Sequence, residues 1–292
     1  MDMNMSMRYY VELCNSSICY SVVRNLTYIE HLHNSFELLY VLDGSIEAEI
    51  ACHRLTLGRG DLLFISKDCI HSYVSTQGSR SVVIAVAPEE VPQFTSLLKE
   101  HPVPFCQMKD AQSRPLVTEC FRILTGPGSN ALNRIAVAGY IDLLLSEFVP
   151  LIQQADPIQP SQPNILANAL KYIYDMIPAP VSSDDVASNV GGSYYHLSRL
   201  FNRRIGINLS TYCSLINILT ARRMLVQTDL AVDDIRQRCG YTNLRSFDRD
   251  FARFTGMSPR EYRTKHQSGG LVDYDIPFVR EMLLKRWDIT LP

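Results

Sequence analysis

Short runs of apolar residues and alternating apolar and polar residues dominate residues 8–87 and predict strands. An apolar and aromatic run at 36–42 is followed by an Asp-Gly pair at 43–44, which is a strong hairpin signal. Residues 45–51 then alternate, with isoleucine and alanine on one face and glutamate on the other. Further apolar runs separated by turns occupy 55–57, 62–65 and 82–87. Many short strands of this kind predict a small barrel or sandwich.

Two helical patterns follow the strands, at residues 109–124 and 131–154. A Gly-Pro-Gly sequence at 126–128 separates them, because neither glycine nor proline favours the interior of a helix. In the second pattern, leucine and isoleucine recur at helical spacing and form a broad apolar face. This face predicts packing either on the chain's own strands or on a second copy of the chain, and both possibilities are kept.

The second half of the chain is helical in period. A proline-rich segment at 155–163 predicts a linker after an N-terminal domain at 1–154. Residues 164–267 then form an all-α domain, and residues 268–292 form a tail that begins with Ser-Gly-Gly. Four apolar side chains of the tail predict a short amphipathic helix that docks back onto the chain. They are Phe278, Met282, Leu283 and Trp287.

The helical region contains a repeated unit, at residues 184–212 and again at 233–262. The matched pairs are Asp184/Asp233, Asp185/Asp234, Val186/Ile235, Gly191/Gly240, Arg199/Arg249, Phe201/Phe251, Arg203/Arg253, Gly206/Gly256 and Tyr212/Tyr262. Two copies of one small helical unit suit a repetitive surface, and a regular helix such as DNA is the obvious candidate.

The second helix of each copy has one apolar and one basic face. Leu197 and Phe201 in the first copy, and Phe247 and Phe251 in the second, are spaced to face the core. The opposite faces carry arginine, whose planar fork can bind guanine in the major groove. The charge distribution agrees, since residues 1–163 carry 11 basic and 17 acidic residues whereas residues 164–267 carry 14 and 9. A solvated face would explain one such helix, but two matched copies favour DNA.

Residues 164–266 resemble the DNA-binding domain of the AraC/XylS family of bacterial transcription regulators. The resemblance rests on Leu197-Ser-Arg-Leu-Phe201 followed by Gly206, on Ala221-Arg-Arg-Met-Leu225, on Gly240-Tyr241 with Ser246-Phe247-x-Arg249-x-Phe251, and on Gly256-Met-Ser-Pro-Arg-Glu-Tyr-Arg263. It implies seven helices, with two helix-turn-helix units joined by a long helix at roughly 209–226. It also implies that the two recognition helices enter successive major grooves on one face of the DNA.

Carried over position by position, the resemblance assigns two kinds of DNA contact. The implied base-reading residues are Tyr195, Ser198 and Arg199 in the first unit and Leu244, Arg245 and Arg249 in the second, and the implied phosphate contacts are Arg203 and Arg253. Gly192 stands where the family usually has an apolar residue, and this glycine is expected to loosen the first turn. Asp248 is expected to face the DNA, where it either accepts from a cytosine amine or orients Arg249.

A cluster of histidines in the strand region resembles the cupin barrel, a pattern that often opens the effector domain of AraC-type regulators. His31, His33 and Glu37 share one face of a regular strand, and His71 follows a later turn and strand. The two resemblances together imply a multidomain fold. Its N-terminal part is an all-β cupin-like barrel with two α-helices, and its C-terminal part is an all-α domain of two helix-turn-helix units.

Three uses of this cluster are open. We favour a pocket lined by His33, Glu37 and His71 that binds a small polar ligand, for which a sugar is one candidate. The four side chains including His31 could instead hold a divalent metal. The proline-rich second cupin motif is incomplete before His71, and the resemblance implies that such regulators often keep the first motif without metal, so no cofactor is expected. The third use is a barrel that binds nothing and only dimerises.

The interpretation is a ligand-responsive transcription regulator, not an enzyme. Its expected partners are double-stranded DNA, a small-molecule effector, a second copy of the chain, and the RNA polymerase that the resemblance implies for an activator. The alternatives are a cupin metalloenzyme with an accessory DNA-binding domain and a constitutive DNA-bending protein.

The chain is also expected to be cytoplasmic. Its eight cysteines are scattered without a Cys-x-x-Cys pair, which predicts free thiols in a reducing compartment. The first residues lack the apolar core of a signal peptide. No stretch is expected to approach the roughly 20 apolar residues of a membrane span.

Overall fold

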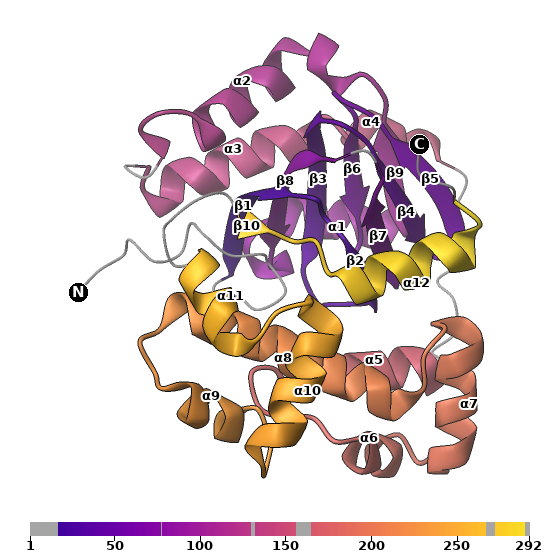
Figure 1. Cartoon of the computed structure of the whole chain (residues 1–292). Coiled ribbons are helices and arrows are strands. Elements are labelled where there is room, and N and C mark those ends of the chain that lie inside the picture. Colours follow the sequence, from indigo (N-terminus) through magenta and orange to yellow (C-terminus); the bar gives the residue numbers. More distant parts are fainter. Residues whose placement is uncertain (1–16, 77, 130–131, 156–164, 267–271, 290–292) are drawn as a thin grey trace.

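Two β-sheets packed face to face make up the N-terminal domain (Figure 1). The structure is a computed structural model that describes residues 17–76, 78–129, 132–155, 165–266 and 272–289. The six-stranded sheet has the order β10-β1-β8-β3-β6-β9, and the four-stranded sheet has the order β2-β7-β4-β5. Neighbouring strands are antiparallel except for the parallel pair of β1 and β10. The strands are β1 (Ile18–Arg24), β2 (Tyr28–His31), β3 (Phe36–Asp43), β4 (Ile46–Ile50), β5 (His53–Leu57), β6 (Leu62–Ile65), β7 (His71–Ser75), β8 (Arg80–Val86), β9 (Phe105–Met108) and β10 (Val272–Asp273).

Strand β3 is buried on both faces, which explains its nearly continuous apolar sequence. Leu39 and Val41 belong to the core between the two sheets. Leu38 and Tyr40 belong to a second core between the larger sheet and the helices. Because side chains alternate along a strand, Glu37 lies on the same inner face as Leu39, where it is fully buried.

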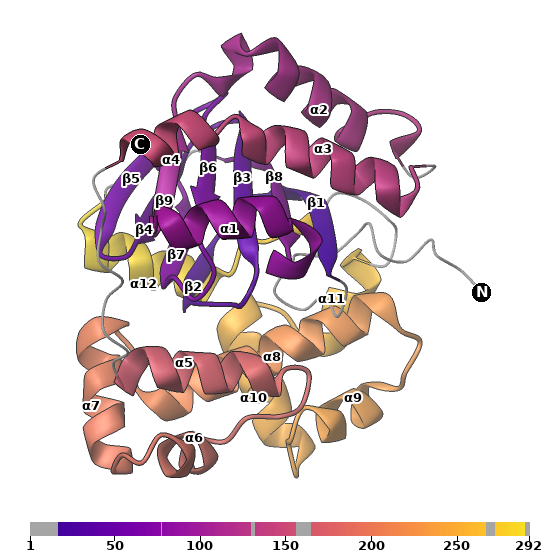
Figure 2. The same cartoon turned by 180° about the vertical axis from the view of Figure 1, so that it is seen from behind.

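Four helices cover the outer face of the larger sheet (Figure 2). They are α1 (Pro92–Glu100), α2 (Pro115–Thr125), α3 (Arg134–Ser146) and α4 (Val149–Gln154). The expected helix at 109–124 is shorter than predicted, since its first regular turn begins at Pro115. The expected helix at 131–154 is divided in two, because Pro150 lies in the first turn of α4.

Helices α3 and α4 correct one expectation from the sequence. The segment Arg134–Gln154 is long and apolar enough to cross a membrane, with a window of mean hydropathy 1.8. The expectation that no stretch approaches a membrane span is therefore wrong by length and composition. However, Ile141, Leu144 and Phe148 of this segment are fully buried against the sheet. A helix that packs on a sheet passes the same test, so the segment is weak evidence for a membrane.

The C-terminal domain is all-α, as predicted, and lies below the barrel in Figure 1. Its helices are α5 (Ile165–Met176), α6 (Ser183–Asn189), α7 (Tyr194–Arg204), α8 (Leu209–Gln227), α9 (Val232–Arg238), α10 (Leu244–Thr255) and α11 (Pro259–His266). The expected linking helix is α8, which contacts both helix-turn-helix units. The predicted linker at 155–163 lies, apart from Ala155, outside the described residues.

The tail docks back onto the chain as expected. Helix α12 (Pro277–Trp287) crosses the junction between the two domains (Figure 1). Val279, Leu283 and Trp287 of α12 are buried, and Phe278 packs edge-on against Phe254 of α10. Before this helix, β10 adds to the edge of the larger sheet beside β1. The tail therefore contacts both domains.

Two further expectations need correction. Six cysteines of the described part are free thiols, but Cys19 is disulfide-bonded, because sequence spacing does not reveal which cysteines come together in space. Gly192 does not loosen the first turn. A Cβ atom at this glycine would lie 2.8 Å from Ile165 of α5 and 2.9 Å from Leu197 of α7, so these two side chains already fill the space of the missing one.

Candidate DNA-binding face and polar cluster of the barrel

The first helix-turn-helix unit consists of α6 and α7. Ser193 caps α7 by accepting from the backbone N–H of His196. Leu197 and Phe201 are fully buried, as their spacing predicted. On the opposite side, Tyr195 is 78% exposed. The remaining predicted DNA contacts of this unit are Ser198, which is half-buried, and Arg199 and Arg203, which are exposed.

The second unit consists of α9 and α10. Asn243 caps α10 by accepting from the backbone N–H of Ser246. Three phenylalanines of α10 fill the core, and the first two are those that the spacing predicted. They are Phe247, Phe251 and Phe254. Leu244 is 49% exposed, and Arg245 is also exposed. The exposed face of α10 therefore begins with a large apolar side chain followed by a basic one.

Arg249 is held by Asp250, not by the neighbour expected from the sequence. The Arg249 Nε donates to Asp250 Oδ1 at 3.1 Å, and 71% of the arginine side chain remains exposed. Asp250 is itself buried and accepts from the hydroxyl of Tyr241 at 3.2 Å. Asp248 is exposed. The role of orienting Arg249 therefore belongs to Asp250, because only its carboxylate is fixed by a second partner.

The guanidinium of Arg253 lies beside a pair of packed aromatic rings. This group lies 5.2 Å from the ring centre of Phe254 and 5.1 Å from that of Phe278 in the tail. The residue is nevertheless exposed. Two ring contacts restrict the directions that this arginine can take, which suits a fixed contact such as a phosphate.

Helices α7 and α10 both pack against α8 and run in the same general direction (Figure 1). The arginines at matched positions of the repeat, Arg199 and Arg249, are both exposed. Two equivalent DNA-reading helices require that neither arginine faces the core, and both arginines meet this requirement.

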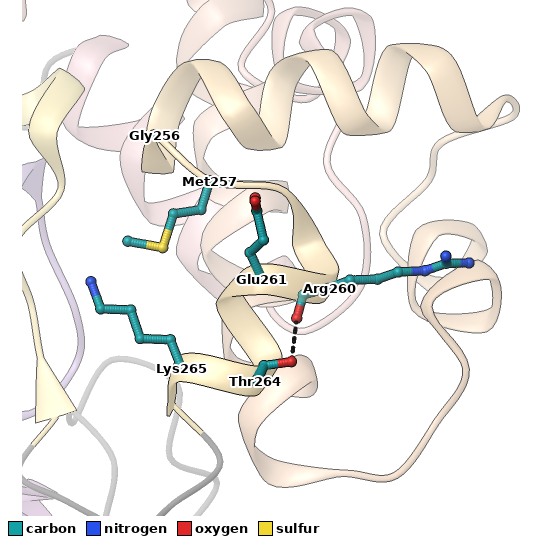
Figure 3. Close-up of a pocket in the computed structure, with 6 residues that line it drawn as sticks. All are labelled: Gly256, Met257, Arg260, Glu261, Thr264 and Lys265. Atoms are coloured by element: carbon teal, nitrogen blue, oxygen red, sulfur yellow. Dashed lines mark hydrogen bonds between the residues drawn. The ribbon is translucent and has the colours of Figure 1, made fainter.

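A second feature of this domain is a surface depression beside α11. It is lined by Gly256, Met257, Arg260, Glu261, Thr264 and Lys265 (Figure 3). Arg260 and Lys265 extend to opposite sides, so they do not form one positive site (Figure 3). Glu261 accepts from the backbone N–H of Ser258 and thereby caps α11. The depression contains none of the predicted DNA or effector contacts.

Inside the barrel, the structure brings together the polar side chains that the sequence singled out. His31, His33, Glu37 and His71 are all buried, and one ligand atom from each lies within 4.8 Å of the others. Glu37 Oε2 lies 3.1 Å from His33 Nε2 and 3.6 Å from His71 Nε2. The other carboxylate oxygen accepts from the hydroxyl of Tyr73 at 2.5 Å. Pattern reasoning missed Tyr73, although it lies two residues after His71 and therefore on the same strand face.

The backbone fixes the orientation of all three imidazoles. The Nδ1 atoms of His31, His33 and His71 lie 2.8, 3.0 and 2.9 Å from the carbonyl oxygens of Ile29, Ser35 and Cys69. A carbonyl oxygen can only accept a hydrogen bond, so each Nδ1 carries a proton and donates it. In a neutral imidazole this arrangement leaves a lone pair on Nε2, directed at the centre of the cluster.

The electrostatics of the cluster favour a carboxylate at Glu37 and a neutral His31. Burial lowers the pKa of His31 to about 3, and the charge of His33 acts in the same direction. Burial alone would raise the pKa of Glu37. Hydrogen bonds from His33 and His71 and their charges outweigh burial and hold the pKa of Glu37 well below its usual range. A negative charge is therefore retained in an interior that otherwise excludes charge.

The cluster lies close to the junction between the domains. The ring of His33 is 6.0 Å from that of Tyr174 on α5. The backbone N–H of Asp68 donates to the His33 carbonyl at 2.7 Å, and the Asp68 carboxylate pairs with Lys171 of α5 at 3.2 Å. A shift of the loop that carries His33 would therefore disturb its contacts with α5.

Edge strand β2 forms a second connection to the C-terminal domain. The buried hydroxyl of Tyr212 on α8 donates to the carbonyl of Glu30 at 2.8 Å. The Glu30 carboxylate pairs with Arg286 of α12, which also donates to the Ile205 carbonyl at 3.1 Å and to Glu49 at 3.2 Å. Burial raises the pKa of Glu30 to about 7 against the opposing effect of Arg286. Arg286 thus joins the barrel, the tail and the end of α7.

Comparison with known proteins agrees with both halves of this description. A family model described as AraC-like ligand binding domain matches residues 17–145, and one described as Helix-turn-helix domain matches residues 186–265. The HTH-type transcriptional regulator YfiF of Bacillus subtilis is 24% identical over 262 residues, which cover 84% of this chain and 82% of that protein. The HTH-type transcriptional activator RhaR of Escherichia coli is 24% identical over 251 residues, which cover 81% of this chain and 87% of RhaR.

A solved structure shares the arrangement of the two parts. The 1.65 Å structure of ToxT from Vibrio cholerae is 12% identical, with a TM-score of 0.53 over 87% of this chain and all of ToxT. This likeness concerns the fold alone. The family models and the full-length relatives carry the assignment. The chain belongs to the AraC/XylS family and is a DNA-binding transcription regulator with an AraC-like ligand-binding domain.

Proposed function

We propose that this chain is a cytoplasmic, dimeric transcription activator whose DNA binding is set by a small polar effector in the barrel. The observation that carries the proposal is the pair of exposed arginine faces on α7 and α10, presented by a domain that contacts the barrel directly. RhaR, which matches most of the chain, is named as a transcriptional activator. Activation implies contact with RNA polymerase, and the proposal includes no catalytic step.

We divide the exposed side chains of α7 and α10 into those that contact bases and those that contact phosphates. Arg249 is oriented by Asp250 and can present its fork to a guanine. We assign base reading to Tyr195, Ser198, Arg199, Leu244, Arg245 and Arg249. Arg203 and Arg253 lie one turn further along their helices and are assigned to phosphates, which fix the register of the protein without reading sequence.

The proposed effector site is centred on His33, Glu37 and His71. A sugar is one class of polar molecule that such donors and acceptors could bind. These side chains are almost fully buried and contact one another, so a sugar-sized effector would have to open the barrel at this point. Opening would move the loop that carries His33, which contacts α5 through Asp68 and Lys171. Effector binding would then shift the population of docked and undocked arrangements of the DNA-binding domain.

The proposed dimer uses the outer face of α3. Ile135 is 85% exposed and Leu143 is 42% exposed, and the two lie on one side of the helix. The opposite side of α3 packs on the barrel. An exposed apolar stripe on a packed helix is a suitable contact for a second copy of the chain.

The test is selection of bound DNA from a random pool, followed by footprinting on the enriched site. The proposal expects two half-sites separated by about one helical turn within each bound monomer. It also expects the footprint to change when the correct effector is added, and mapping of the enriched site onto the source genome would indicate candidate effectors from neighbouring genes. Failure to enrich any sequence would contradict the proposal.

A further inference from the structure

We propose that His31, His33, Glu37 and His71 bind one divalent transition-metal ion inside the barrel. This inference deepens the proposed function, because it names a ligand for the same site, and only its regulatory consequence rests on that function. Donor atoms about 2.1 Å from a tetrahedral metal lie roughly 3.4 Å from one another. The separations of 3.1 and 3.6 Å between Glu37 Oε2 and two imidazole Nε2 atoms are close to that value.

The first argument is the orientation of the donors. All three imidazoles donate Nδ1–H to backbone carbonyls and direct Nε2 inwards, which is the usual outer-shell arrangement of metal-binding histidine. Glu37 has the equivalent support, since the Tyr73 hydroxyl holds one carboxylate oxygen and leaves the other facing the histidines. Four donors with their outer contacts already made need little rearrangement to bind an ion.

The second argument is the closeness of the donor atoms. His33 Nε2 lies 3.1 Å and His71 Nε2 lies 3.6 Å from the same carboxylate oxygen of Glu37, and one donor atom from each of the four buried side chains lies within 4.8 Å of the others. A single metal ion at the centre would contact all four side chains at once, whereas a hydrogen bond joins only one pair.

The donor set also identifies the class of metal. Three imidazole nitrogens and one carboxylate oxygen suit zinc and first-row metals such as iron, cobalt and nickel. Calcium and magnesium prefer sites built from oxygen alone. The cluster is therefore assigned to a divalent transition metal.

Metal binding would fix the loop that carries His33. This loop accepts from the backbone of Asp68, which pairs with Lys171 of α5, and the His33 ring lies beside Tyr174 of the same helix. An ion that holds His33 in place would stabilise the surface on which α5 docks. On the proposed function, the metal then favours the docked arrangement of the DNA-binding domain.

The experiment is a cobalt titration of the chelator-treated full-length chain, followed by elemental analysis after loading with zinc. The expected result is one equivalent of metal per chain, with the visible absorption of cobalt bound by nitrogen. His71→Ala and Glu37→Gln should each weaken binding by more than about tenfold. His53→Ala is the matched control, because this exposed histidine makes the same Nδ1 contact to the carbonyl two residues earlier, at 3.0 Å, but lies outside the cluster.

Two results would overturn the inference. One is binding of less than about a tenth of an equivalent by the wild-type chain with zinc, cobalt, nickel, manganese and ferrous iron, which requires no variant to fold. The other is stoichiometric binding that neither cluster variant changes, provided that both variants still bind DNA as a test of folding. Footprinting with and without zinc separates the regulatory part. Stoichiometric metal with an unchanged footprint would retain the site and contradict its role in the proposed function.

Discussion

Removal of one hydroxyl group tests whether a hydrogen bond holds the DNA-binding domain against the barrel. Tyr212 of α8 is buried, and its hydroxyl donates to the Glu30 carbonyl of β2 at 2.8 Å. Tyr212→Phe removes this donor and keeps the ring, which packs edge-on against Phe201. The substitution therefore weakens the contact between the domains without opening a cavity in the helical core.

The expected cost follows from the burial of the bond. A typical internal hydrogen bond contributes about 1 kcal/mol, and a buried acceptor left without a partner raises the loss to about 1–3 kcal/mol. A loss of 1 kcal/mol at the interface corresponds to a roughly fivefold larger population of the undocked arrangement, and 3 kcal/mol to more than about a hundredfold. The loss of stability should be confined to the contact between the two domains.

Hydrogen exchange of the full-length chain measures this opening at individual amides. Tyr212→Phe should accelerate exchange in β2 and α12 by at least about fivefold. The control is Tyr262→Phe, the matched position of the second repeat, whose hydroxyl accepts from Arg222 at 3.0 Å within the DNA-binding domain. That variant should alter exchange in α8 and α11 and leave β2 unchanged. Equal acceleration of β2 in both variants, or none in Tyr212→Phe, would refute the argument.

Three further predictions concern DNA binding, the stability of α10 and the oligomeric state. Arg249→Ala should cost about 1–3 kcal/mol on the selected site and relax specificity at one base pair, whereas Arg253→Ala should weaken all sequences alike and lower the salt slope by about one. Titrations on specific and random DNA distinguish the two, and equal losses on both kinds of DNA would contradict the assignment. Asn243→Ala should reduce the free energy of unfolding by about 1 kcal/mol in urea, because α10 loses its cap, and unchanged stability would count against this reading. Ile135→Glu should convert a dimer into a monomer in analytical ultracentrifugation without lowering the melting temperature, and a surviving dimer would exclude the α3 face.

Local patterns predicted the local features of the fold well. The Asp-Gly pair at 43–44 does form the turn between β3 and β4, with Gly44 at a φ of +73°. The apolar spacing in α10 placed Phe247 and Phe251 in the core. These features depend on a few neighbouring residues, so the sequence contains the information directly.

Features that depend on distant partners were not predicted. Strand β10 exists because the tail returns to β1, and nothing in its two residues indicates this pairing. The support of Arg249 by Asp250 depends on Tyr241, which lies before α10. In the barrel, period-two spacing brought His31, His33 and Glu37 to one face, but the closeness of His71 follows from the pairing of β2 with β7. Contacts that the local periodicity does not contain decided each of these points.

The described contacts between the domains also set a limit on regulation. A ligand can shift an equilibrium only by the difference between its interactions with the two states. The polar ties that undocking would break include the Tyr212 hydrogen bond, the Lys171–Asp68 pair and the contacts of Arg286. The Tyr212 hydrogen bond and the contacts of Arg286 contribute about 1 kcal/mol each, and the Lys171–Asp68 pair contributes less because both of its side chains are nearly half exposed. Together these polar contacts amount to roughly 2–3 kcal/mol, or a factor of about 30–150 in affinity for DNA. A much larger effect would require the apolar packing between the domains or the dimer contact to change as well.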